Sequence, residues 1–304
     1  MDRHLKVIID FDGTLTAEET QVALLAEKSL DTLANEIIGV PRQALAADYA
    51  ATQARLLAAP HRYWWEVNGL VASYCDEGAF ILNTTTLQVM LRENSNYARA
   101  VAAAFPQAEY EPVVDCINYL FHRHTAELPP RFRPAARDVL VTLTDHPGRS
   151  PVVLTNSLGD KVRRQLATLA LDGEVAVLGD TRQYGMDPGW THRFLHPELG
   201  EIQVWPVGKR YQVDLRRPAY YRALVRAAAD GSRLAVVADT FSLPGAVPLM
   251  MGIPFFLVHT SYTPDWCAQA VDVHPLARVL DDLSDLPAAL DDWSATESGK
   301  RWIL

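Results

Sequence analysis

The sequence has few of the features of a secreted, membrane-bound or nucleic-acid-binding protein. Its 304 residues include only three cysteines. Cys75, Cys116 and Cys267 are widely spaced and show neither a CxxC pattern nor the Cys/His spacing of a metal site. We therefore expect three reduced, mostly buried thiols, as is usual in cytosolic proteins.

Long apolar segments are also missing. The N-terminal stretch MDRHLKVIID lacks the hydrophobic region of a signal peptide. The longest apolar run, residues 243–258, holds three prolines and two glycines and is too interrupted to span a bilayer. We expect a cytoplasmic protein with no membrane partner.

Positive charge is scarce. The chain has 28 Lys and Arg against 37 Asp and Glu, which gives a formal net charge of −9. This balance argues against a nucleic acid or an anionic membrane as the main partner. With 49% hydrophobic and 21% charged residues, the composition is that of an ordinary globular protein, long enough for more than one compact unit.

The order of apolar patterns predicts an α/β fold. Short apolar runs that suit buried parallel strands occur at residues 6–9, 151–154, 175–178, 234–237 and 255–258. Helical patterns separate the later runs. A long helical block, residues 17–128, follows the first one. The sequence therefore predicts a Rossmann-like parallel-sheet core (1–16 and 129–304) with an inserted helical domain (17–128).

Residues 180–215 are less regular and contain two further strand-like runs, at 202–205 and 210–215. They indicate a β extension of the core. Such an extension offers a surface for a homodimer or for a contact with the inserted domain, and the sequence leaves both open. Within the inserted domain, Tyr63-Trp64-Trp65 has helical spacing, which favours core packing over substrate stacking.

Polar side chains follow three of the expected strands at the point where each one ends. Asp10 and Asp12 follow the first, Thr155 the second, and Asp239 a later one. Ligands of open α/β sheets bind at the carboxyl ends of the strands, so these side chains can converge. An isolated Asp or Thr after a strand can equally be a turn or helix-cap residue.

The loop Asp10-Phe-Asp-Gly-Thr is more specific. Two carboxylates straight off a buried strand are costly unless a cation or hydrogen bonds compensate them. Gly13 permits a sharp turn that brings backbone N–H groups towards an anion, and Thr14 adds a hydroxyl. Asp10 then suits a nucleophile and Asp12 a general acid/base. A site for a divalent cation alone is the other interpretation.

With these residues in view, the chain resembles the phosphatase form of the haloacid dehalogenase (HAD) superfamily. DFDGTLT at 10–16 is similar to its motif I, and VVLTNS at 152–157 to its motif II. LRRPAYY at 215–221 resembles motif III, and LAVVADT at 234–240 resembles motif IV. The four matches occur in family order. Residues 17–128 fall where that family places a helical C1-type cap.

The resemblance implies a role for each matching residue. Asp10 would attack phosphorus to form an aspartyl-phosphate, and Asp12 would protonate the leaving oxygen and later activate water. Mg²⁺ would be held by Asp10, Asp239 and the backbone carbonyl of Asp12. Thr155 would bind the phosphoryl oxygens. Four neighbours of these groups are further candidates for phosphate binding: Gly13, Thr14, Asn156 and Ser157.

The resemblance also calls for a cation, which motif III usually supplies as a lysine. Arg217 is best placed for that role, with Arg216 and Lys209 as rivals. Motif IV departs further from the family. Ala238 stands where Gly is usual, and Leu243 and Pro244 stand where a second acid is expected. We expect a working but weaker Mg²⁺ site.

The sequence therefore predicts a Mg²⁺-dependent phosphomonoesterase for a small phosphorylated metabolite. Two alternatives remain open. The same aspartyl-phosphate chemistry could serve a phosphotransferase or phosphomutase. The thinned motif IV could instead belong to a binding protein on a catalytically impaired HAD fold.

Overall fold

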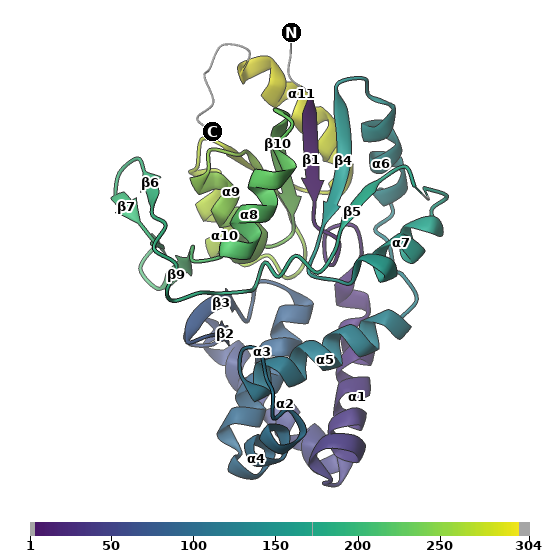
Figure 1. The fold of residues 1–304 in the computed structure, drawn as a ribbon, viewed down its shortest axis with the longest axis vertical. Coiled ribbons are helices and arrows are strands. Elements are labelled where there is room, and N and C mark those ends of the chain that lie inside the picture. The colour runs from purple at the N-terminus through teal and green to yellow at the C-terminus, as the bar shows by residue number, and fades with distance from the viewer. Residues whose placement is uncertain (1–3, 172, 298–304) are drawn as a thin grey trace.

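The computed structural model describes residues 4–171 and 173–297. A six-stranded sheet forms the centre of one half of the molecule (Figure 1). Its strands, in spatial order, are β12 (Ala277–Leu280), β11 (Phe255–Val258), β10 (Arg233–Ala238), β1 (Leu5–Ile9), β4 (Arg149–Leu154) and β5 (Ala176–Leu178). All neighbours are parallel, so β1 and its partners β4 and β10 end at the same edge. The predicted α/β fold class is confirmed.

Helices cover both faces of this sheet, because alternate strand residues point to opposite sides. In β1, Leu5, Val7 and Ile9 join one buried apolar cluster and Ile8 joins the other. The first cluster is completed by α6 (Ala136–Asp145), α7 (Gly159–Ala167) and α11 (Leu286–Glu297). The second is completed by α8 (Pro218–Ala227), α9 (Ala246–Met250) and α10 (Asp265–Asp272).

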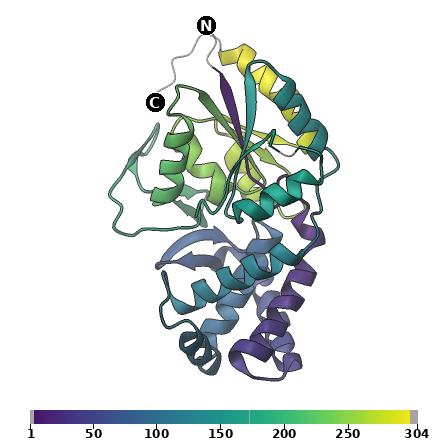
Figure 2. The same cartoon turned by 45° about the vertical axis from the view of Figure 1, so that its right-hand side comes forward.

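The segment between β1 and α6 forms a second, mainly helical body beyond the carboxyl edge of the sheet (Figures 1 and 2). Its helices are α1 (Val22–Thr32), α2 (Arg42–Ala58), α3 (Ala79–Glu93), α4 (Ser95–Ala104) and α5 (Pro112–Glu127). Helix α3 is buried at every position from Ala79 to Gln88 and packs against α2, α4 and α5. We call this body the cap. The cap also has the 3₁₀ turns η1 (Glu18–Thr20) and η3 (Pro60–Arg62) and the π-helical turn η2 (Leu33–Ile38). The core has the π-helical turn η4 (Phe241–Gly245) and the 3₁₀ turn η5 (Leu283–Asp285).

A β-hairpin in the cap replaces the helix expected around Tyr63-Trp64-Trp65. It pairs β2 (Trp64–Val67) with β3 (Leu70–Tyr74). Its turn residues Asn68 and Gly69 have φ of 52° and 75°. Positive φ at both central positions is the geometry of a type I′ hairpin turn, which Asn-Gly favours. The local turn signal therefore prevails over the helical spacing of the aromatic residues.

The cap is joined to the core at two places. The two connecting segments run side by side, with an isolated antiparallel β-bridge between Thr16 and Phe132. The hairpin makes a separate contact, because β3 packs against β9 (Tyr211–Asp214) and the η4 turn. Glu77, just after β3, accepts hydrogen bonds from both the backbone N–H and the hydroxyl of Ser242 in the core. The cap is thus tied to the core beyond its covalent connections.

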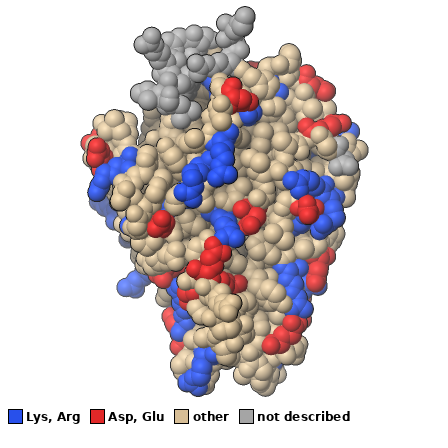
Figure 3. All heavy atoms as spheres, viewed as in Figure 1, with Lys and Arg blue, Asp and Glu red and all other residues tan. Residues whose placement is uncertain are grey.

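Residues 194–214 form two hairpins outside the main sheet; the strands expected at 202–205 and 210–215 correspond to the second hairpin, and the first was not predicted. They pair β6 (Phe194–His196) with β7 (Gly200–Ile202), and β8 (Val204–Val207) with β9. Acidic and basic side chains are interspersed over the face seen in Figure 3. All three cysteines are buried and unpaired. None of the helices in the described ranges has both the length and the apolar character needed to cross a bilayer.

Candidate active site

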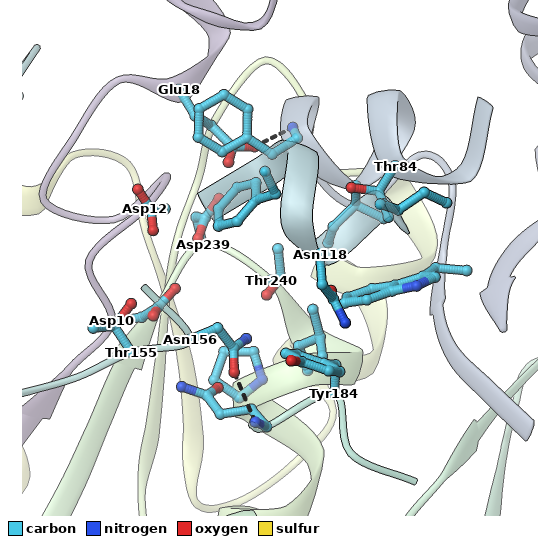
Figure 4. A pocket seen from close by; sticks show the side chains of 18 of the residues that line it. Asp10, Asp12, Glu18, Thr84, Asn118, Thr155, Asn156, Tyr184, Asp239 and Thr240 are labelled. Atoms are coloured by element: carbon cyan, nitrogen blue, oxygen red, sulfur yellow. Dashed lines mark hydrogen bonds between the residues drawn. The ribbon is translucent and has the colours of Figure 1, made fainter. Parts of the chain in front are cut away.

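A pocket lies where the carboxyl ends of the central strands meet the cap. Asp10 and Asp12 follow β1, Thr155 follows β4, and Asp239 follows β10, and all four line this pocket. Figure 4 shows the three aspartates and Thr155 on one side of it, towards the ends of the strands. The sequence predicted that these residues would converge, because parallel strands end at a common edge of the sheet.

The loop after Asp12 is fixed against Asp239. Gly13 has φ of +85°, and a Cβ atom at this position would lie 2.1 Å from Oδ2 of Asp239. Thr14 donates from Oγ1 to Oδ1 of Asp239 (3.1 Å) and accepts from its backbone N–H (3.0 Å). Arg133, from the connection leaving the cap, donates through Nε to the carbonyl of Gly13 (2.9 Å). Glycine is therefore required at position 13 by both backbone conformation and close approach.

The carboxylates of the pocket repel one another. Burial raises the pKa of Asp10 well above its usual value, and the charges of Asp239 and Asp12 raise it further. Burial raises the pKa of Asp239 to about 7, although the hydrogen bond from Thr14 and the charge of Arg133 oppose this shift. Burial and then the charge of Asp239 raise the pKa of Glu18. A group of acids in this state would be stabilised by a cation.

The donors at the pocket suit a hard cation. In the described part of the chain, no three Asp, Glu, His or Cys side chains form a ready-made metal site. The carboxylates of Asp10 and Asp239, with the backbone carbonyl of Asp12, offer only oxygen atoms. Mg²⁺ prefers such ligands and commonly keeps several of its waters, so it does not need a third carboxylate. These residues therefore fit Mg²⁺ in the chemistry of their donors.

Lys161 is a site residue that the sequence interpretation missed. The residue is only 5% exposed. Its Nζ lies 3.3 Å from Oδ1 of Asp12 and donates to Oγ of Ser157 (2.9 Å), and that hydroxyl donates to Oδ2 of Asp12 (2.5 Å). One signal was available: Lys161 is in the first turn of α7, where the helix dipole disfavours a cation.

The residues after β4 divide into two groups. Thr155 and Asn156 line the pocket. The hydroxyl of Thr155 accepts from the backbone N–H of Ser157 (3.1 Å), and the Oδ1 of Asn156 accepts from the N–H of Gln183 (2.7 Å). Ser157 is fully buried behind them, where it contacts Asp12. The structure thus brings Thr155 and Asn156 to the pocket and gives Ser157 a supporting place.

None of the three candidates for the motif III cation lines the pocket. Arg217 is fully buried, and its guanidinium donates to the backbone carbonyls of Asp214, Gln183 and, from the cap hairpin, Ala72. Arg216 pairs with Asp214 (2.5 Å). Lys209 lies in the turn between β8 and β9, beside a different depression. The expected placement of Arg217 is corrected: it joins the hairpin to the core, and Lys161 is the cation beside Asp12.

No protein-family model matches the chain, and no curated protein matches its sequence. Solved structures do match in fold. YfnB from Bacillus subtilis, described as a HAD-hydrolase bound to magnesium, has 12% identity and a TM-score of 0.51, over 95% of this chain and 100% of that chain. A haloacid dehalogenase-like family hydrolase from Xanthomonas campestris has 13% identity and a TM-score of 0.48, over 99% and 100%. The likeness to YfnB shows that this chain has the HAD fold.

Proposed function

We propose that the chain is a Mg²⁺-dependent phosphomonoester hydrolase that acts through an aspartyl-phosphate on a small phosphorylated substrate. The observation that carries this proposal is the pairing of Asp10 with Asp12 at the end of the central strand. Both carboxylates line the pocket, and Asp12 is also held by Ser157 and Lys161. Two neighbouring carboxylates with different surroundings suit the division of labour between nucleophile and general acid/base.

In this mechanism Asp10 attacks phosphorus and the ester oxygen leaves with a proton from Asp12. Asp12 then takes a proton from water, which attacks the aspartyl-phosphate and frees Asp10. Thr155 lies at the pocket wall, where its hydroxyl can meet the phosphoryl oxygens. Mg²⁺, held by Asp10, Asp239 and the carbonyl of Asp12, would offset the negative charge of the phosphoryl group.

Removal of metal tests this proposal directly. The purified chain should hydrolyse p-nitrophenyl phosphate with Mg²⁺ and lose that activity with a chelator. Mg²⁺ together with a phosphate mimic such as vanadate should raise the melting temperature, because ligands that bind only the native state stabilise it, by about 2.7 kcal/mol at a hundredfold excess over Kd. Activity that persists after metal removal would contradict the assigned metal site.

A binding protein on an impaired HAD fold is the second candidate. It is favoured by Leu243 and Pro244, which line the pocket close to Asp239 where a second acid was expected. This candidate predicts neither a rise in melting temperature with Mg²⁺ and vanadate nor turnover of any phosphate ester. The same two measurements therefore separate the candidates.

A Lys161→Met variant is expected to reduce kcat/KM by about 10- to 100-fold, because a hydrogen bond to a charged group contributes about 1.5–3 kcal/mol. Lys161→Arg should recover part of the loss, since it keeps the charge beside Asp12. Lys209→Met is the matched control: it removes the same type of cation outside this pocket. Equal effects at positions 161 and 209 would show that Lys161 has no special role.

A further inference from the structure

Much of the pocket wall apart from the aspartates is apolar. This part of the wall is built by side chains from β2, the start of α3, one face of α5 and the core segment after β5: Trp65, Phe80, Ile81, Ile117, Phe121 and Tyr184. The rings of Trp65, from the cap, and Tyr184, from the core, lie 5.0 Å apart between centroids. A leaving group that extends from a phosphate at Asp10 would therefore meet aromatic and aliphatic surface.

The departure from motif IV belongs to this wall. Leu243, which stands near the place of the expected second acid, is buried in one apolar cluster with Trp65, Ile81 and Tyr184. A carboxylate at this position would be desolvated among those side chains. Leu243 thus extends the apolar surface that faces the leaving group, and its apolar neighbours explain why a leucine rather than an acid stands here.

Positive charge is missing from the lining. No Lys or Arg of the described residues lines this pocket, whereas Asp10, Asp12, Glu18 and Asp239 all do. His122 is present, but burial lowers its pKa, which disfavours its charged form. The ammonium group of Lys161 already pairs with Asp12 and donates a hydrogen bond to Ser157. A second anionic group on the substrate would therefore have no cation to meet it.

The wall does carry uncharged hydrogen-bonding groups. Thr84 and Asn118 point into the pocket from the cap, opposite the aspartates (Figure 4). The indole N–H of Trp65 is buried and has no hydrogen-bond partner among the described residues. Such groups can orient a hydroxyl or carbonyl group of a ligand. Binding a ligand that offers them no hydrogen bond costs free energy.

We infer that this pocket selects phosphate monoesters of uncharged, partly apolar alcohols that carry a hydroxyl, carbonyl or amide group, and that it rejects substrates with a second anionic group. The inference rests on the proposed function, because it assumes that phosphate binds at Asp10. It follows from the apolar wall, its uncharged hydrogen-bonding groups and the lack of a lining cation among the described residues. Specificity of this kind comes from leaving a wrong charge unpaired.

Three matched substrates test the inference: benzyl phosphate, its 4-carbamoyl derivative and its 4-carboxylate derivative. The amide and the carboxylate are nearly equal in size and differ in charge. We expect kcat/KM for the amide to exceed that for the carboxylate by about 100-fold, with benzyl phosphate closer to the amide. A carboxylate that is hydrolysed as well as the amide would overturn the inference. If neither p-nitrophenyl phosphate nor any of the three benzyl phosphates is hydrolysed, the proposed function is overturned, together with the inference that rests on it.

A charge placed on the wall should weaken the preference for the amide. Asn118→Lys is expected to raise kcat/KM for the carboxylate relative to the amide by about tenfold or more. Tyr119→Lys is the matched control, because it adds the same charge on the neighbouring residue of α5, which is 40% exposed and outside the pocket lining. An unchanged ratio in Asn118→Lys, or an equal shift in both variants, would contradict the assigned wall. Should either variant fail to fold, the wild-type comparison of amide and carboxylate decides alone.

Discussion

An Asp10→Asn variant is expected to release phosphate at least about 10⁴-fold more slowly than the parent chain, because an amide cannot replace the attacking carboxylate. The substitution keeps the size of the side chain. It also removes one charge from a group in which burial and the charges of Asp239 and Asp12 already raise the pKa of Asp10. We therefore expect the metal-free variant to melt at the same temperature as the parent or higher.

Both readouts are needed for that variant. Steady-state hydrolysis of p-nitrophenyl phosphate measures the loss of chemistry, and a melting curve shows that the fold is kept. An inactive variant that melts far below the parent would attribute the loss to unfolding. A well-folded variant with full activity would contradict the role of Asp10 as nucleophile.

A Glu77→Ala variant is expected to lose about 3–5 kcal/mol of unfolding free energy, the largest stability effect that we predict. Glu77 is 1% exposed. Its Oε1 accepts from the hydroxyl of Ser73 (2.9 Å), the backbone N–H of Tyr74 (2.9 Å) and the hydroxyl of Ser242 (2.6 Å). Its Oε2 accepts from the N–H of Ser242 (2.8 Å). Alanine would leave these buried donors without an acceptor and open a cavity.

Denaturant unfolding measures this effect, and a chain of this size should lose on the order of 10 °C in melting temperature. Glu93→Ala is the matched control, because Glu93 pairs with Arg55 at the surface and is 53% exposed. Exposed pairs contribute about 0–1 kcal/mol. Equal small losses in both variants would show that Glu77 does not hold the hairpin to the core.

The sequence predicted the fold and the centre of the site because both depend on local patterns. Apolar runs that stop at Asp10, Thr155 and Asp239 mark strands of a parallel sheet, and the shared edge of that sheet brings their ends together. The hairpin turn at Asn68-Gly69 was equally local, and it was overlooked because the aromatic residues before it also fit a helix.

The cations could not be predicted in the same way. Arg217 and Lys161 both follow a strand end at short distance, so chain position alone does not distinguish them. Only their tertiary contacts distinguish them. Backbone carbonyls from three segments accept hydrogen bonds from Arg217, whereas Lys161 contacts Ser157 and Asp12. The apolar wall has the same origin, because Trp65, Tyr184 and Leu243 are far apart in sequence and meet only in the folded chain.

Chemical trapping of the intermediate tests the central claim most directly. Borohydride reduces an acyl phosphate to an alcohol, so an aspartyl-phosphate formed during turnover would become homoserine. Rapid quenching with borohydride in the presence of substrate and Mg²⁺, followed by peptide mass spectrometry, should find homoserine at position 10 and aspartate at position 12. Turnover without this change, or with the change at another acid, would contradict the proposal that Asp10 is the nucleophile.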